Sequence, residues 1–228
     1  MIIKRDKSII ISCDIDDLDK LKHLVKESCD VEGVGAYKIG FELVIKYGIN
    51  KVIDEIRKLT KLPIIYDHQK AATDTPFTGK KFAAVCKPVD AVILFPHAGP
   101  VTEKEWIIEC KKAGLGVIVG SEMTHEAYLE KDGGYITNKA PEQMIKIAIE
   151  NGINDFVVPG NKPEKVKQYR KIIGEKGVLY SPGIGAQGGS IEEYSKAAGK
   201  YWHAIIGRSI YNAKDIKSAT IQFCTYVG

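Results

Sequence analysis

The sequence predicts an α/β protein in which residues 1–228 form a single (β/α)8 TIM barrel, and three observations support this prediction. First, short apolar runs recur about every 25 to 30 residues, with helical patterns between them. Second, eight such units follow one another without a break in composition, which indicates one domain built on a parallel sheet. Third, the last two units end in segments that suit a phosphate, as the last two strands of such barrels often do.

The predicted strands are rich in isoleucine and valine. Most lack the strict alternation of apolar and polar residues that is typical of a strand with one solvent-exposed face. Strands are expected at residues 8–13, 34–39, 62–66, 89–95, 115–120, 155–158, 177–180 and 203–206. The segments between them read as amphipathic helices. In residues 16–28 three leucines and a valine fall on one face, and residues 103–113 repeat the pattern. A doubly wound open sheet is the alternative, but the even spacing of the units favours a closed barrel.

Composition and charge exclude several classes of function. The net charge of +4 comes from lysines scattered along the whole chain, which is typical of a solvated surface and does not predict nucleic-acid binding. The five cysteines are odd in number and widely spaced, so neither a disulfide framework nor a zinc site is expected. The N-terminal segment lacks a secretory apolar region, and no apolar run is long enough to cross a bilayer. We therefore expect a soluble cytoplasmic protein with no membrane partner.

Two segments near the C-terminus predict a phosphate site. Residues 183–189 contain four glycines directly after the predicted seventh strand. Such a loop exposes backbone N–H groups at the start of a helix, where an anion is favoured. Gly207 and Arg208 follow the eighth strand, and an arginine there can hold a phosphate with two parallel hydrogen bonds. The glycines alone could simply make tight turns, but the Gly-Arg pair one barrel unit later favours phosphate binding.

A barrel of this kind places its active site at the C-terminal ends of the strands, so polar residues are expected where each apolar run stops. They are found at Asp14, Lys38, Asp67, His97, Glu122, Thr124, Asn161, Gln187 and Arg208. Core packing alone does not predict so many polar groups at strand ends.

The third predicted strand is followed by two carboxylates that bracket a lysine, in the order Asp67, Lys70 and Asp74. Held together in a barrel mouth, these groups form an alternating charge array in which the carboxylates keep the lysine protonated. Such a lysine can deliver a proton to a carbanion that forms beside it. Lys38 would flank the array and keep Asp67 ionised. The alternative for this segment is a surface salt-bridge cluster in which Asp74 caps a helix.

The chain resembles the orotidine 5'-monophosphate decarboxylase family, in its compact archaeal form. The resemblance covers nearly the whole length and is carried by four motifs: Tyr37-Lys38-Ile39-Gly40, Asp67 to Pro76, Ser121-Glu122-Met123-Thr124-His125, and Pro182 to Gly189 together with Ile206 to Tyr211. It implies decarboxylation of orotidine 5'-monophosphate (OMP) to UMP, with neither a metal ion nor an organic cofactor.

The resemblance also implies roles for the residues of the reacting end. Lys70 would be the proton donor, and Asp67 would lie beside the carboxylate of the substrate. Asp74 would come from the neighbouring subunit of a homodimer and complete the charge array. Thr78 would also cross the interface, to reach the ribose of the partner's nucleotide.

On the binding side, the same resemblance implies that Asp14 and Lys38 bind the ribose hydroxyls. Thr124 would hydrogen-bond the pyrimidine ring. Gln187, Gly207 and Arg208 would hold the phosphate. Pro182 and Gly183 would also bind the substrate, and residues 183–189 would form a flexible lid.

The spacing of the charged motif departs from the family pattern D-x-K-x-x-D. Here two residues separate Asp67 from Lys70, and three separate Lys70 from Asp74. In a plain strand, residues two apart share a face, so the longer spacing predicts a bulge or turn between Asp67 and Lys70. A simple alignment would place Gln69 at the lysine position. We assign Lys70 because only a lysine can serve as the proton donor.

Two alternatives remain open at this stage. One is a Mg²⁺-dependent sugar-phosphate enzyme of the same superfamily, either a hexulose-phosphate synthase or a ketogulonate-phosphate decarboxylase. Those enzymes hold the metal partly with a glutamate on the second strand, where this chain has Lys38, which repels a cation. The other is a non-catalytic nucleotide-binding protein whose altered spacing has disabled the charge array. The presence of Lys38, Lys70 and Thr124 argues against it.

Overall fold

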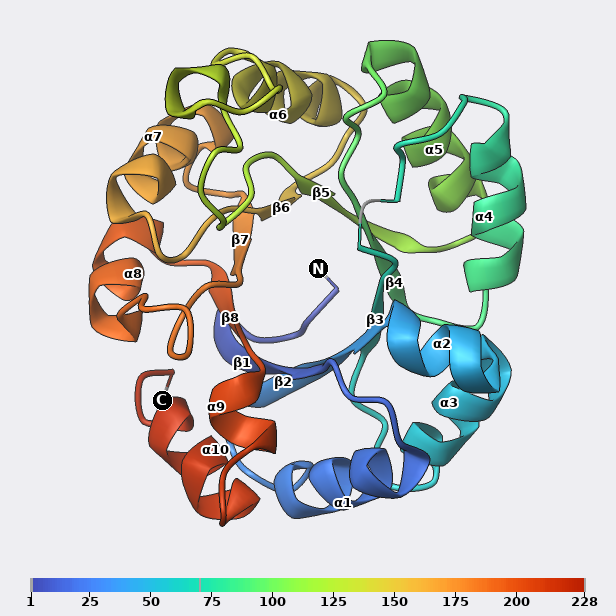
Figure 1. The fold of residues 1–228 in the computed structure, drawn as a ribbon, viewed down its shortest axis with the longest axis vertical. Helices are drawn as coiled ribbons and strands as arrows, with labels where there is room; N and C mark the ends of the chain where they lie inside the picture. Colours follow the sequence, from blue (N-terminus) through green and yellow to red (C-terminus); the bar gives the residue numbers. More distant parts are fainter. Residues whose placement is uncertain (1, 70, 228) are drawn as a thin grey trace.

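The structure is a closed barrel of eight parallel strands in sequence order, β1 to β8 (Figure 1). It is a computed structural model that describes residues 2–69 and 71–227, so Lys70 lies outside the described residues. The barrel closes where Lys7 of the first strand pairs with Trp202 of the last. The strands are β1 (Lys7–Cys13), β2 (Val34–Gly40), β3 (Ile64–Asp67), β4 (Ala91–Leu94), β5 (Gly116–Gly120), β6 (Asp155–Val157), β7 (Val178–Ser181) and β8 (Trp202–Ile206).

Helices form a ring around the barrel (Figure 1). They are α1 (Leu18–Ser28), α2 (Phe41–Tyr47), α3 (Ile49–Arg57), α4 (Thr78–Cys86), α5 (Pro100–Lys112), α6 (Ala140–Glu150), α7 (Pro163–Ile173), α8 (Ile191–Ala198), α9 (Arg208–Tyr211) and α10 (Ile216–Cys224), with a 3-10 turn at Glu130–Asp132. None of the helices in the described part of the chain is long and apolar enough to cross a membrane.

The prediction of a (β/α)8 barrel is confirmed, and the eight predicted strands all form, with ends that shift by at most two residues. The third strand starts later than predicted because Pro63 has no N–H to contribute to the sheet. The segment between β2 and β3 contains two helices instead of one. Gly48 separates them with a φ of 83°, a conformation that favours glycine.

The core has two layers, one between the sheet and the helices and one inside the barrel. Alternate strand residues such as Ile10, Ala36, Ile65 and Ile205 share the inner layer. Lys38 follows Ala36 by two positions and therefore points the same way, one level closer to the C-terminal end of the strands. The apolar inner layer thus forms a floor beneath the polar residues of the barrel mouth.

Candidate functional site

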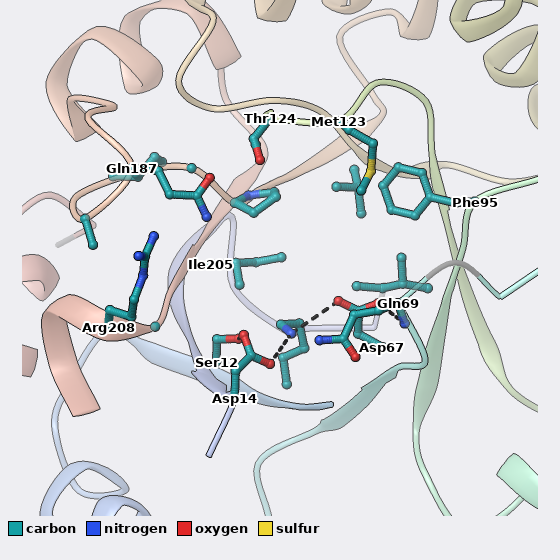
Figure 2. A pocket seen from close by; sticks show the side chains of 18 of the residues that line it. Ser12, Asp14, Asp67, Gln69, Phe95, Met123, Thr124, Gln187, Ile205 and Arg208 are labelled. Atoms are coloured by element: carbon teal, nitrogen blue, oxygen red, sulfur yellow. Dashed lines mark hydrogen bonds and ion pairs between the residues drawn. The ribbon is translucent and has the colours of Figure 1, made fainter. Parts of the chain in front are cut away.

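A cavity of about 200 Å³ lies at the C-terminal ends of the strands (Figure 2). The predicted site residues that line it are Asp14, Lys38, Asp67, Thr124, Pro182, Gly183, Gln187, Gly207 and Arg208. Residues at or just beyond the C-terminal ends of six different strands are therefore brought to one place, as a barrel active site requires.

Lys38 is the centre of the charged side of this cavity. Its side chain is only 6% exposed, and its Nζ donates to Asp14 Oδ1 at 2.8 Å and to Asp67 Oδ2 at 3.2 Å. Burial alone would lower the pKa of Lys38, but the carboxylates of Asp67 and Asp14 outweigh it and raise the pKa above its ordinary value. Lys38 is therefore a fixed cation, and the expectation that it flanks Asp67 is confirmed.

Asp14 is held as the ionised partner of this lysine. Ser12 Oγ donates to its second oxygen, Oδ2, at 2.7 Å. Burial raises the pKa of Asp14, but Lys38 and Ser12 together lower it below the ordinary value. Ser12 was not predicted as a site residue, because a serine inside a strand carries no signal of function.

The chain leaves strand geometry directly after Asp67, the last residue of β3. Asp67 Oδ1 accepts a hydrogen bond from the backbone N–H of Gln69 at 2.9 Å, and Gln69 has a φ of 47°. Such a positive φ is uncommon for a residue other than glycine and turns the chain sharply. The predicted departure from regular strand geometry is therefore confirmed up to Gln69. The position of Lys70, the assigned proton donor, lies outside the described residues.

Asp74 and Thr78 do not line the cavity of their own chain. Asp74 is exposed, and its Oδ1 accepts from the N–H of Thr75 at 2.6 Å. The segment is fixed to α5, because Trp106 Nε1 donates to the Thr75 carbonyl at 3.0 Å. The alternative in which Asp74 caps a helix is wrong, since α4 begins at Thr78 and Phe77 occupies its cap position. Their contribution to a partner's site stays a prediction.

Thr124 follows β5, and its hydroxyl points into the cavity (Figure 2). Two neighbouring residues after β6 hold the backbone of this loop. Asn161 Nδ2 donates to the Thr124 carbonyl at 3.1 Å, and Lys162 Nζ donates to the Met123 carbonyl at 3.0 Å. The sequence singled out Asn161 only as a strand-end residue, and the structure gives it this supporting contact.

The same lysine is tied to a buried carboxylate. Lys162 Nζ lies 2.9 Å from Glu122 Oε1, while Tyr169 donates to Oε2 and Lys165 lies 3.5 Å from it. Burial would raise the pKa of Glu122, but the hydrogen bonds from Tyr169 and Lys162 lower it overall. Glu122 is therefore an ionised anchor under the Thr124 loop. This network joins β5 to α7, and strand-end positions alone could not predict it.

The side of the cavity that is predicted to bind phosphate contains Gln187 and Arg208. These two side chains approach each other from the loop after β7 and from the start of α9 (Figure 2). The glycine-rich loop is folded on itself, because the N–H of Gly189 donates to the Gly183 carbonyl at 3.0 Å. Ser209 Oγ accepts from the N–H of Ala186 at 3.0 Å and connects this loop to α9. Sequence reasoning missed Ser209.

Apolar side chains complete the lining of the cavity, and two of them, Phe95 and Met123, lie opposite Arg208 (Figure 2). This apolar wall is formed by Ile93, Phe95, Met123, Val157 and Ile205. The sequence could not separate these residues from the rest of the core, because an apolar side chain at a strand end looks the same whether it meets a ligand or another side chain. A wall of this kind can pack against a flat ring.

Comparison with known proteins identifies the family. The model of the orotidine 5'-phosphate decarboxylase / HUMPS family matches residues 7–223. Orotidine 5'-phosphate decarboxylase of Methanosarcina mazei is 34% identical over 229 residues, covering 96% of this chain and 94% of the relative. The relative from Methanococcoides burtonii is 30% identical, covering 97% of this chain and 98% of its own length.

Solved structures agree with the relatives. The orotidine 5'-monophosphate decarboxylase from Methanocaldococcus jannaschii, complexed with the inhibitor BMP, has a TM-score of 0.85 at 26% identity, over 97% of this chain and 99% of that chain. The enzyme from Pyrococcus horikoshii OT3 has a TM-score of 0.80 at 26% identity, over 96% of this chain and 98% of that chain. The chain therefore belongs to the orotidine 5'-phosphate decarboxylase / HUMPS family.

Proposed function

We propose that this protein decarboxylates OMP to UMP. The observation that carries the proposal is the arrangement of one cavity: Lys38 between two carboxylates on one side, Arg208 with Gln187 on another, and Thr124 with an apolar wall between them. These groups match a ribose, a phosphate and a pyrimidine ring. The curated relatives named orotidine 5'-phosphate decarboxylase support the same activity.

In the proposed reaction, the bond between C6 of the pyrimidine ring and the carboxylate carbon breaks. CO2 leaves, and the electron pair stays on C6 as a carbanion. Lys70 then donates a proton to C6 and gives UMP. Because the ring offers no electron sink for this carbanion, fixed charges around C6 must stabilise it, and Asp67 with Asp74 would hold the Lys70 ammonium in place. Neither a metal ion nor an organic cofactor enters this scheme.

Phosphate binding contributes to the rate from a distance. Arg208 and Gln187 lie on another side of the cavity from Asp67 (Figure 2). Contacts with a part of the substrate that does not react can close the loop of residues 183–189 and order the charged groups, so that binding free energy lowers the barrier of the chemical step.

The proposal includes a homodimer in which Asp74 and Thr78 reach the partner's nucleotide. Both residues lie away from the cavity of their own chain. Exposed apolar side chains in these segments support an interface. Phe77, next to Thr78, is 74% exposed. Val101, which is 64% exposed, precedes Thr102, whose Oγ1 donates to the Asp74 carbonyl at 3.0 Å. Exposed apolar residues close together are typical of a surface that another chain covers.

The Mg²⁺-dependent sugar-phosphate enzymes remain the alternative within the family. The carboxylates of Asp14 and Asp67 already share the Lys38 ammonium, and this charge between them repels a divalent cation. That pairing favours the decarboxylase over an enzyme that must place Mg²⁺ at the same strand ends.

The test is turnover of OMP, followed by its absorbance change, with and without EDTA. A decarboxylase retains its activity in EDTA, the sugar-phosphate enzyme acts only on its own substrates with Mg²⁺, and a nucleotide-binding protein turns over neither. The Lys70→Ala variant is the matched control: it should lose turnover while it still binds UMP through phosphate and base. Substantial turnover by this variant would place the proton donor elsewhere.

A further inference from the structure

Gln69 is a cavity residue to which the proposed chemistry gives no role. It follows β3 by two positions, and its side chain lies beside Asp67 in the cavity (Figure 2). Its side-chain Oε1 accepts a hydrogen bond from the backbone N–H of Phe41 at 3.1 Å. Phe41 is the first residue of α2, and the cap residue Gly40 has no side chain to satisfy that N–H. Gln69 therefore caps α2 from another loop.

This hydrogen bond fixes which way the amide faces. Because the Phe41 N–H is a donor, the Gln69 oxygen must face it, and the Nε2 group must point away from that N–H. A Cβ atom added to Gly40 would lie 3.3 Å from Gln69 Nε2 and 2.9 Å from Asp14 Oδ1. The amide nitrogen and the Asp14 carboxylate thus both lie beside the bare Cα of Gly40.

The Nε2 group has hydrogen-bonding capacity left over. Within the described ranges 2–69 and 71–227, no group accepts a hydrogen bond from it. Asp14, by contrast, only accepts hydrogen bonds when it is ionised, and Lys38 only donates them. A pair of sugar hydroxyls presents both donors and acceptors. Asp14 can accept hydrogen bonds from the hydroxyl groups. The hydroxyl oxygens can then accept hydrogen bonds from N–H donors on the same side of the cavity.

We propose that Gln69 Nε2 donates a hydrogen bond to a ribose hydroxyl of the bound nucleotide, next to the contacts from Asp14 and Lys38. The inference rests on the proposed function, because it takes a ribonucleotide as the ligand. The two-residue gap between Asp67 and Lys70 makes the contact possible. Asp67 and Gln69 are two positions apart, and both reach the cavity.

The test compares the dissociation constants of UMP, 2'-deoxy-UMP and 3'-deoxy-UMP for the wild-type chain and for Gln69→Met, measured by calorimetry. Removing one neutral hydrogen bond should weaken UMP binding about 5- to 10-fold. If the partner is a ribose hydroxyl, the same substitution should change binding of one of the two deoxy ligands by about twofold or less, since that ligand lacks the hydroxyl.

Gln187→Ala is the matched control, because Gln187 faces the phosphate side and its loss should weaken all three ligands by the same factor. Gln69→Glu is the second variant. It keeps an oxygen for Phe41 N–H but has no donor, so it should show the same dependence on the hydroxyl even where Gln69→Met folds poorly.

An equal loss of affinity for all three ligands would show that Gln69 only caps α2, and it would overturn the inference. Unchanged UMP affinity in both variants, or no UMP binding by the wild-type chain, would overturn it too. Turnover of OMP by the wild-type chain decides the proposed function separately, so a failure of the Gln69 contact leaves that result intact.

Discussion

The Nζ atom of Lys162 lies 2.9 Å from Oε1 of Glu122, a carboxylate that is only 2% exposed. This ion pair does more than neutralise a buried charge, because the same ammonium also donates to the Met123 carbonyl next to Thr124. The loop that contains Met123 and Thr124, which we expect to bind the pyrimidine ring, is therefore anchored to α7 and to the turn before it.

We predict that Lys162→Met weakens binding of the base more than binding of the phosphate. The change removes the contact to Met123 and leaves Glu122 with Tyr169 and Lys165 as partners, so the loss of stability should be smaller than the roughly 3–5 kcal/mol that is typical of a buried charge left uncompensated. Inhibition constants for UMP should rise, while those for ribose 5-phosphate, which lacks the base, should change little. Lys165→Met is the control, since Lys165 contacts Glu122 at 3.5 Å but makes no hydrogen bond to the loop backbone within the part of the chain that the structure describes. Equal effects of the two substitutions on UMP would contradict the positioning role.

We predict that Arg208→Ala raises KM for OMP strongly and lowers kcat/KM. A charge-assisted contact to phosphate contributes about 1.5–3 kcal/mol, which corresponds to a loss of about 10- to 150-fold in kcat/KM. Steady-state kinetics on OMP measure the effect, and Gln187→Ala should act in the same direction with a smaller magnitude. An unchanged kcat/KM would remove Arg208 from the phosphate site.

We predict that mixing two inactive variants restores activity. Lys70→Ala and Asp74→Ala subunits, allowed to exchange, form hybrid dimers in which one site has both wild-type groups. Activity should therefore return on mixing, up to about a quarter of the wild-type level if exchange is random, because half of the dimers are hybrids and each has one intact site. Exchange is checked by mass spectrometry of differently tagged subunits. Confirmed exchange with no recovery would show that each chain builds its site alone.

We predict that His203 makes the protein less stable in acid. His203 is buried in β8, where Ser8 Oγ lies 2.7 Å from its Nδ1, and burial lowers its pKa from the ordinary 6.5 to about 3. Below pH 6.5 the unfolded chain binds a proton at this residue that the folded chain does not, so folding becomes less favourable as the pH falls towards 3.

The measurement for this prediction is the free energy of unfolding in urea at several pH values for the wild type and for His203→Gln. The difference attributable to His203 should grow by up to about 1.4 kcal/mol per pH unit within that window. Parallel pH profiles for the two proteins would show that His203 does not carry the acid sensitivity.

The barrel and its charged residues could be predicted because each depends on a local pattern. A buried strand followed by a polar residue is visible in sequence, and the closed barrel brings every such residue to the same edge. Asp14, Lys38 and Asp67 were found in this way, although they come from three different strands.

The rest of the site depends on conformation and long-range contacts that leave no local pattern. The cap that Gln69 provides for α2 joins residues 28 positions apart, and Gln69 itself adopts a positive φ that the sequence does not reveal. The tie between Lys162 and Glu122 joins residues 40 positions apart. Ser209 acts through a backbone N–H of another loop, which no side-chain motif can reveal.

The glycine-rich loop after β7 makes several hydrogen bonds within itself and one to α9. Besides the bond between Gly189 and Gly183, the N–H of Gly185 donates to the Gly189 carbonyl at 2.9 Å, and Ser209 holds Ala186. Fixing the backbone of one residue costs about 1–2 kcal/mol in conformational entropy. Because folding has already met part of this cost, we expect a phosphate bound at this loop to spend less of its binding free energy on ordering the backbone.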